Sequence, residues 1–199
     1  MDKEVINYRY YHWGPLLYSS KVTPERVTKI LKICNKAKDS YTHNLAGHIK
    51  KELKLPALKI FNILKPYFLS YARVQTDDYA LKPLPILEME SAWVNYMKKG
   101  EFNPPHSHDG ILSFVLFLQI PDELKKENKK YNGTSMGAGS IEFRTGTLAL
   151  NSHSFFPKEG DLFIFPSNLE HWVYPFKSNV ERISVSGNLH QPTKGGAKK

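Results

Sequence analysis

The sequence predicts a mainly β protein of the α+β class, with a double-stranded β-helix (jelly roll) core and an N-terminal helical layer. Two observations support this prediction. Apolar residues recur at helical spacing over roughly the first 80 positions, whereas from about residue 85 short extended stretches alternate with turns. Many short strands separated by Gly, Pro and Asn are typical of a sandwich or barrel of the jelly-roll kind.

We expect one structural domain built from three segments. Residues 1–84 form the helical layer packed on the core, residues 85–190 form the jelly roll, and residues 191–199 form a flexible tail. A chain of 199 residues is long enough for one hydrophobic core and a small accessory layer.

The helical layer has a clear start at Thr23-Pro24, because Thr is a good N-cap and Pro suits the first helical position. Apolar residues then follow at helical spacing. We expect a second helical stretch near His43–Leu53 and a third over Ala57–Val74. The third contains Pro66, which predicts a kink or a break there.

The expected strands of the core are short and bounded by turn residues. They cover Ile86–Tyr96, Ile111–Ile120, Ser140–Phe143, Thr147–Asn151, Asp161–Phe165, His171–Tyr174 and Glu181–Leu189. Between them, Lys125–Gly139 is polar and rich in lysine and glycine, so it has little to bury. We expect a mobile loop there, either a lid that becomes ordered with substrate or a plain solvated linker.

Composition excludes several classes of protein. The single cysteine, Cys34, rules out a disulfide framework and fits a reducing, cytoplasmic compartment. No apolar run approaches the roughly 18 residues of a membrane span, and the N-terminus does not resemble a signal peptide. The formal charge of +9 fits ordinary solvation and attraction for a small dianion better than a nucleic-acid substrate.

Three histidines are candidate metal ligands. His106 and His108 are two residues apart, so on a strand both imidazoles point to the same face. His171 opens a later strand after a Pro-Ser turn. Imidazole suits Fe(II), and three ligands on one side leave the other coordination positions open. A second set remains open, in which a one-residue bulge brings Asp109 to the metal in place of His106 or His108.

A polar stripe on the last strand is a candidate anion site. Arg182, Ser184, Ser186 and Asn188 alternate with Ile183 and Val185 and therefore share one face. In a region that is otherwise apolar, we expect this face to line a pocket. The planar fork of Arg182 suits a carboxylate, and the hydroxyl of Ser184 can add a third donor.

These residues resemble a known family. The motifs are Trp93-Val94-Asn95, Asn103-Pro104-Pro105-His106-Ser107-His108, Gly160-Asp161-Leu162, Phe165-Pro166-Ser167-Asn168-Leu169-Glu170-His171 and Arg182-Ile183-Ser184. Over roughly residues 85–190 the chain is similar to the iron(II)- and 2-oxoglutarate-dependent oxygenases, and most similar to an uncharacterised subfamily of marine bacteria and phages. One departure concerns His108, because the broad superfamily has a carboxylate at that position.

The resemblance implies an enzyme that uses Fe(II), 2-oxoglutarate and O₂ and releases succinate and CO₂. It implies that Arg182 and Ser184 hold the far carboxylate of 2-oxoglutarate, with Asn95, Tyr96 and Asn188 as further pocket contacts. Comparison with prolyl hydroxylases suggests hydroxylation of a peptide or protein side chain. A phage-encoded protein would act in the host cytoplasm.

Two other functions remain open at this point. A cupin-like metalloenzyme, either an isomerase or a dioxygenase without a cosubstrate, would suit three histidines but has no need for the Arg182-x-Ser184 pair. A non-catalytic binding domain, with the helical layer docking a partner, would hold no metal.

Overall fold

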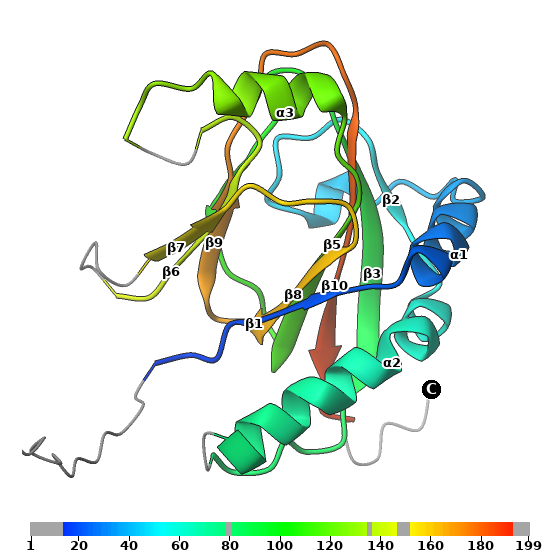
Figure 1. The fold of residues 1–199 in the computed structure, drawn as a ribbon. Helices are drawn as coiled ribbons and strands as arrows, with labels where there is room; N and C mark the ends of the chain where they lie inside the picture. The colour runs from blue at the N-terminus through cyan, green and yellow to red at the C-terminus, as the bar shows by residue number, and fades with distance from the viewer. Residues whose placement is uncertain (1–13, 79–80, 135–136, 147–151, 193–199) are drawn as a thin grey trace, which may run out of the picture.

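The computed structural model describes residues 14–78, 81–134, 137–146 and 152–192. In these residues two antiparallel sheets face each other, and two helices, Pro24–Cys34 and Ala57–Arg73, cover the outer face of the larger sheet (Figure 1). The strands are β1 (Tyr18–Lys21), β2 (Glu52–Lys54), β3 (Glu88–Met97), β4 (Asn103–His106), β5 (Leu112–Gln119), β6 (Ile141–Arg144), β7 (Ser152–Phe155), β8 (Asp161–Pro166), β9 (Glu170–Val173) and β10 (Arg182–His190). The helices are α1 (Pro24–Cys34), α2 (Ala57–Arg73) and α3 (Asp122–Lys129), with a 3₁₀ turn at Thr42–Asn44 and a π turn at Val74–Asp78.

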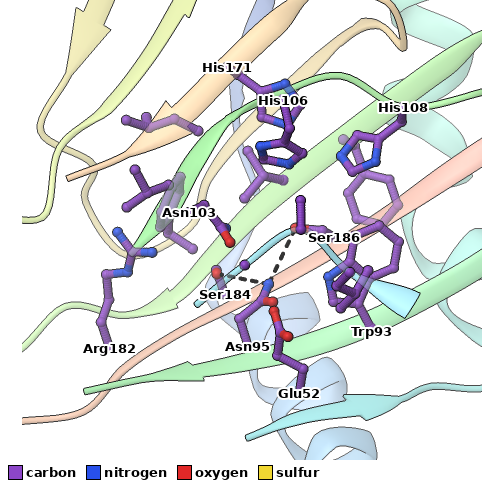
Figure 2. Close-up of a pocket in the computed structure, with 18 of the residues that line it drawn as sticks. Glu52, Trp93, Asn95, Asn103, His106, His108, His171, Arg182, Ser184 and Ser186 are labelled. Atoms are coloured by element: carbon purple, nitrogen blue, oxygen red, sulfur yellow. Dashed lines mark hydrogen bonds between the residues drawn. The ribbon is translucent and has the colours of Figure 1, made fainter. Parts of the chain in front are cut away.

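Two sheets of different width make up the jelly roll within the described residues. The six-stranded sheet has the order β1-β8-β5-β10-β3-β2, and the four-stranded sheet has the order β4-β9-β6-β7. The predicted fold class, a mainly β jelly roll with helices added, is confirmed. Aromatic and aliphatic side chains from both sheets, among them Phe117, Phe143 and Phe165, fill most of the space between them. A cavity interrupts this packing, and the metal-ligand candidates line it (Figure 2).

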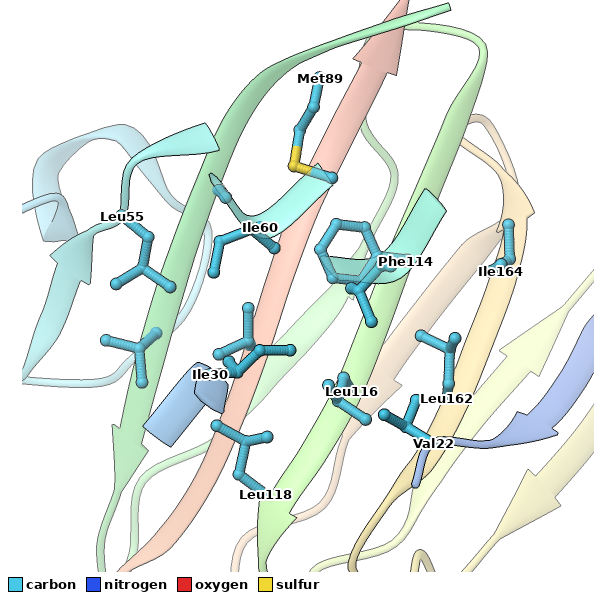
Figure 3. Close-up of a cluster of buried hydrophobic side chains, with 14 of the residues drawn as sticks. Val22, Ile30, Leu55, Ile60, Met89, Phe114, Leu116, Leu118, Leu162 and Ile164 are labelled. Atoms are coloured by element: carbon cyan, nitrogen blue, oxygen red, sulfur yellow. The ribbon is translucent and has the colours of Figure 1, made fainter. Parts of the chain in front are cut away.

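The helical layer packs on the other face of the six-stranded sheet (Figure 3). Ile30 of α1 and Ile60 of α2 are fully buried against sheet residues such as Leu116 and Leu162. Helix α2 buries Ile60, Leu64, Phe68 and Tyr71, which lie on one stripe. Its continuous run through Pro66 shows that the predicted break is wrong. Pro66 is on the exposed side, where water can satisfy the carbonyl that proline leaves free.

The N-terminal segment is not wholly helical, which corrects the sequence prediction. The helix expected over His43–Leu53 is absent: a 3₁₀ turn is followed by irregular chain and then by β2. Strands β1 and β2 form the two edges of the six-stranded sheet, where they pair with β8 and β3. Such short edge strands depend on their hydrogen-bonded neighbours and carry little periodicity of their own.

Part of the expected mobile loop is also ordered as a helix. Residues Asp122–Lys129 form α3, whose Leu124 is fully buried. The Glu127 carboxylate accepts hydrogen bonds from the backbone N–H groups of Lys177 and Ser178, at 2.8 and 2.7 Å. The first residues of the expected lid are therefore fixed to the loop before β10. The strand expected at Thr147–Asn151 and all but the start of the expected tail lie outside the described residues.

In the described part of the chain, no helix combines the length and the apolar character that a membrane crossing requires.

Helix α2 offers a matched test of the helical layer. Leu64 has 0% exposure and Leu69, on the same helix, has 60%. We expect Leu64→Ala to lower the free energy of unfolding by about 2–5 kcal/mol, because it removes buried methylenes and leaves a cavity. Leu69→Ala should change it by less than about 0.5 kcal/mol. Urea unfolding of both variants measures this, and equal effects would show that α2 does not stabilise the sheet.

Candidate metal centre

Two of the three histidines face each other across a pair of strands. His106 ends β4 and pairs in register with His171 of β9. Pro104 and Pro105 interrupt the register just before His106, since proline has no N–H to donate to the ladder. His108 lies two residues past the strand, where its backbone N–H donates to the Ser167 carbonyl at 2.8 Å. One ligand atom from each histidine lies within 4.8 Å of the other two.

Backbone carbonyls orient two of the rings. The Nδ1 atoms of His106 and His171 lie 2.7 and 2.9 Å from the carbonyl oxygens of Pro104 and Leu169. A carbonyl can only accept, so each Nδ1 carries the proton and donates it. Each Nε2 then keeps its lone pair for a metal ion. This arrangement, a ligand whose second nitrogen is held by the backbone, is usual for metal-binding histidines.

Burial keeps the three imidazoles neutral. Desolvation lowers the pKa of His171 to about 3 and the pKa of His108 to about 4, and it also lowers the pKa of His106. The neighbouring imidazoles add to the lowering for His171 and His108. Neutral imidazole is the form that binds a divalent metal, so no proton has to leave at neutral pH. The donor set therefore fits Fe(II).

The Asp109 alternative has a different geometry. Its side chain is exposed, and within the described residues the cluster of ligand atoms consists of the three histidines alone. Asp109 instead lines an open vestibule on the outer side of His106 and His108, with a volume of about 650 Å³. The three-histidine set is the one that the described side chains bring together.

A buried cation lies in the same cavity. Arg182 is 1% exposed, and its Nη1 donates to the Gly139 carbonyl at 3.0 Å. Its guanidinium carbon lies 5.2 Å from the centre of the Phe117 ring, and its Nε has no hydrogen-bond partner among the residues that the structure describes. Burial lowers the pKa of Arg182 to about 10, so the group remains charged at neutral pH. A desolvated guanidinium with an unused donor fits the carboxylate of 2-oxoglutarate.

The other predicted contacts divide between three places. Ser184 and Asn95 line the cavity, and the Asn95 amide donates to the hydroxyls of Ser184 and Ser186 at 3.4 and 3.5 Å. Asn188 lies in the vestibule, where its Oδ1 accepts a hydrogen bond from Ser113. Tyr96 is a correction: successive strand residues point to opposite faces, so it projects into the helical layer and donates to the Cys34 carbonyl.

Sequence reasoning missed several residues of the cavity. Glu52, Gly47 and Asn103 line it together with Trp93. Glu52 is 1% exposed, and desolvation, followed by the nearby Glu101 carboxylate, raises its pKa to about 7. No sequence signal marks Glu52, because it falls in the segment predicted to be helical.

Residues 91–188 match the family model described as "Putative 2OG-Fe(II) oxygenase". These 98 of the chain's 199 residues are similar throughout to the 2OG-Fe(II) oxygenases, a family whose cofactors are Fe(II) and 2-oxoglutarate. A search of curated proteins gives no match. The family match supports an oxygenase over the cupin-like and non-catalytic alternatives.

Solved structures of low identity share the fold. An oxidoreductase of the 2OG-Fe(II) oxygenase family from Burkholderia pseudomallei has 15% identity and a TM-score of 0.58, covering 89% of this chain and 84% of that one. A prolyl-4-hydroxylase from Pseudomonas putida has 16% identity and a TM-score of 0.55, covering 88% and 92%. A non-heme alpha-ketoglutarate-dependent epimerase of nogalamycin biosynthesis has 10% identity and a TM-score of 0.54, covering 90% and 82%. A hydroxylase and an epimerase on one fold show that fold alone does not fix the reaction.

The three-histidine set predicts which substitutions remove the metal. We expect His171→Ala to lose tight binding of Fe(II), because it leaves only the two ligands of one segment. Asp109→Ala should keep the metal at wild-type stoichiometry. Elemental analysis of the purified proteins measures both, and full metal content in the His171 variant would show that the ligand set is different.

Glu52 predicts a pH dependence of the ligand-free protein. Its pKa is raised in the folded state, so its contribution to stability is complete below the unfolded value near 4.5 and is lost as the pH rises through about 7. The loss is on the order of 3 kcal/mol. Glu52→Gln should flatten this part of the stability curve, as measured by urea unfolding between pH 4 and pH 8. Parallel curves for the two proteins would contradict it.

Proposed function

We propose that this protein is an Fe(II)- and 2-oxoglutarate-dependent dioxygenase that hydroxylates a side chain of a peptide or protein. The observation that carries the proposal is the buried guanidinium of Arg182, which lines the same cavity as the three histidines and pairs with no carboxylate among the described residues. A metal site alone would suit many reactions. A separate cation for a dicarboxylate favours the use of 2-oxoglutarate.

The protein's part in this reaction is to bind, orient and exclude water. His106, His108 and His171 would each hold the iron through one ring nitrogen. In His106 and His171 this nitrogen is Nε2, because a backbone carbonyl accepts the proton of Nδ1. When bound, iron would activate O₂ as the oxidant, with 2-oxoglutarate oxidised to succinate and CO₂ and the second oxygen atom added to the substrate. Arg182 and Ser184 hold the distal carboxylate and so fix the direction in which the cosubstrate lies.

Aromatic side chains keep the inner wall of the site dry. The rings of Phe165 and Phe143 lie 4.8 and 6.0 Å from the His171 ring, measured between centroids. This wall excludes water from one side of the metal position and leaves the vestibule as the way in for substrate. His106 and His108 line the vestibule, and Phe143 and Phe165 do not.

The choice of hydroxylation rests on likeness to prolyl hydroxylases in fold. The structural neighbours include a prolyl-4-hydroxylase and a prolyl hydroxylase solved with a peptide fragment, which supports a peptide or protein substrate. The epimerase and carbocyclase neighbours use the same fold for other outcomes. Mass spectrometry of the product distinguishes them, because hydroxylation adds one oxygen atom to the substrate.

A succinate-formation assay tests the cosubstrate. Purified protein with Fe(II), ascorbate and 2-oxoglutarate should form succinate slowly without a substrate, through uncoupled turnover. Omission of iron, or the His171→Ala variant, should abolish it. No succinate above the level of the metal-free control would contradict the proposed function.

Arg182 predicts how the cosubstrate requirement changes. Arg182→Lys keeps a positive charge but loses the fork of parallel donors. The loss of a charge-assisted hydrogen bond costs roughly 1.5–3 kcal/mol, so the 2-oxoglutarate concentration for half-maximal succinate formation should rise about 10- to 100-fold.

The matched control is Arg144→Lys. Arg144 is an exposed arginine that pairs with Glu170. Its substitution should leave the 2-oxoglutarate concentration for half-maximal succinate formation unchanged. Metal content should equal the wild type in both variants. An unaltered 2-oxoglutarate titration for Arg182→Lys would rule out its role.

A further inference from the structure

A row of polar side chains crosses three neighbouring strands on the cavity face of the six-stranded sheet. Ser184 of β10 pairs in register with Asn95 of β3, and Asn95 pairs with Glu52 of β2. All three are buried, at 3%, 3% and 1% exposure. Figure 2 shows Glu52 beside Asn95, with Asn95 turned toward Ser184 and Ser186.

Two oxygen atoms of this row, one on Glu52 and one on Asn95, accept no hydrogen bond from the described residues. Within the described residues, Glu52 Oε2 and Asn95 Oδ1 are buried and have no hydrogen-bond partner. Both belong to side chains that line the cavity. An unsatisfied buried acceptor carries a desolvation cost, which is larger for a charged group. Two such acceptors on directly paired residues, facing a cavity, form a place for a donor from a ligand.

The loop opposite fits closely over this place. A Cβ atom at Gly47 would lie 2.2 Å from Asn103 Oδ1 and 3.0 Å from Glu52 Oε1. Only glycine allows the backbone this approach. The loop at residues 45–47 also lines both the cavity and the vestibule through Leu45 and Ala46. This loop, with His106 and His108, therefore forms a wall common to the cavity and the vestibule.

The charges around this end of the cavity favour a cation. Glu101 is 7% exposed and adds a second carboxylate near Glu52, where it accepts from the backbone N–H groups of Lys50 and Lys98. Neither Lys51 nor Lys54 lines the cavity: Lys51 lies over the Tyr96 ring, and Lys54 lies over the Tyr41 ring and lines the vestibule. Arg182, the cation that lines the cavity, is assigned to the cosubstrate carboxylate.

We propose that Glu52 and Asn95 form a subsite for a cationic N–H donor of the primary substrate, a primary ammonium or a guanidinium group. This inference rests on the proposed oxygenase function and narrows its substrate class. The ionised carboxylate of Glu52 and the Asn95 amide oxygen bind the same N–H group. Without that group, Glu52 takes up a proton and donates it to Asn95 Oδ1, which satisfies both atoms. The cavity thus binds a carboxylate at Arg182 and a cation at Glu52.

A pair of small probes tests the charge preference directly. The protein is loaded with Zn(II), which is diamagnetic and does not turn over, and with 2-oxoglutarate. It is then titrated with n-butylammonium or with 1-butanol, a neutral donor of similar size, while the Trp93 indole resonance is followed by NMR. The wild type should bind n-butylammonium at least about tenfold more tightly than 1-butanol. Equal affinities would overturn the inference.

Variants locate the preference. Glu52→Gln replaces the carboxylate by an isosteric amide that can still donate to Asn95, and it should reduce the tenfold ratio to less than about twofold. Glu90→Gln removes the same charge from a residue of the vestibule that is paired with His190, and it should leave the ratio unchanged. A ratio that persists in Glu52→Gln would place the cation elsewhere and overturn the inference. Should Glu52→Gln fail to fold, Glu52→Asp, which withdraws the carboxylate by one methylene, should lower the ratio instead.

These measurements separate the inference from the proposed function. Probe binding is read without turnover, so a protein that forms no succinate but still prefers n-butylammonium would contradict only the proposed function. A protein that forms succinate but binds the two probes equally would contradict only the cation subsite.

Discussion

The interior of this protein depends on one buried guanidinium, that of Arg182, which has no carboxylate partner in the described part of the chain. Taking such a cation out of water costs several kcal/mol, and the Gly139 carbonyl and the Phe117 ring compensate for only part of this. The fold sustains Arg182 in that position because β10 is paired along its length with β3 on one side and β5 on the other. The interior is therefore a packed apolar core around a polar space, with a positive charge that the carboxylate of a ligand can balance.

The parts of the fold that could be predicted are those with their own local pattern. The alternation of Arg182, Ile183, Ser184 and Val185 indicated one polar and one apolar face, and the structure has Ile183 and Val185 in the helical-layer cluster. A pattern of this kind needs no knowledge of the partner strand, because the side-chain direction follows from position along the chain. His106 and His108 were also expected to lie close together, and their ring centroids are 4.9 Å apart, but His108 lies past the end of β4, so its position does not follow from the alternation of a strand.

The parts that could not be predicted depend on distant partners. Glu52–Lys54 has too few residues for a period, and it is a strand because β3 offers it a free edge. Glu52 owes its place in the cavity to that pairing. Helix α3 was not predicted because it is short, highly charged and buries one residue, Leu124, so its sequence resembles that of a solvated loop. Its contact with the rest of the protein, the hydrogen bond from the Lys177 N–H to the Glu127 carboxylate, involves a distant segment of the chain. Tyr96 was predicted to contact the pocket together with its neighbour Asn95. Adjacent strand residues point to opposite faces, so Asn95 lines the cavity and Tyr96 does not.

The way in which the metal ligands are oriented has a consequence for which substitutions the site tolerates. His106 and His171 are each held by the carbonyl two residues earlier in the same segment, Pro104 and Leu169. The tautomer is therefore encoded by the local backbone and does not require a particular side chain elsewhere. Substitution of the side chains around the site can therefore leave the orientation of both rings unchanged.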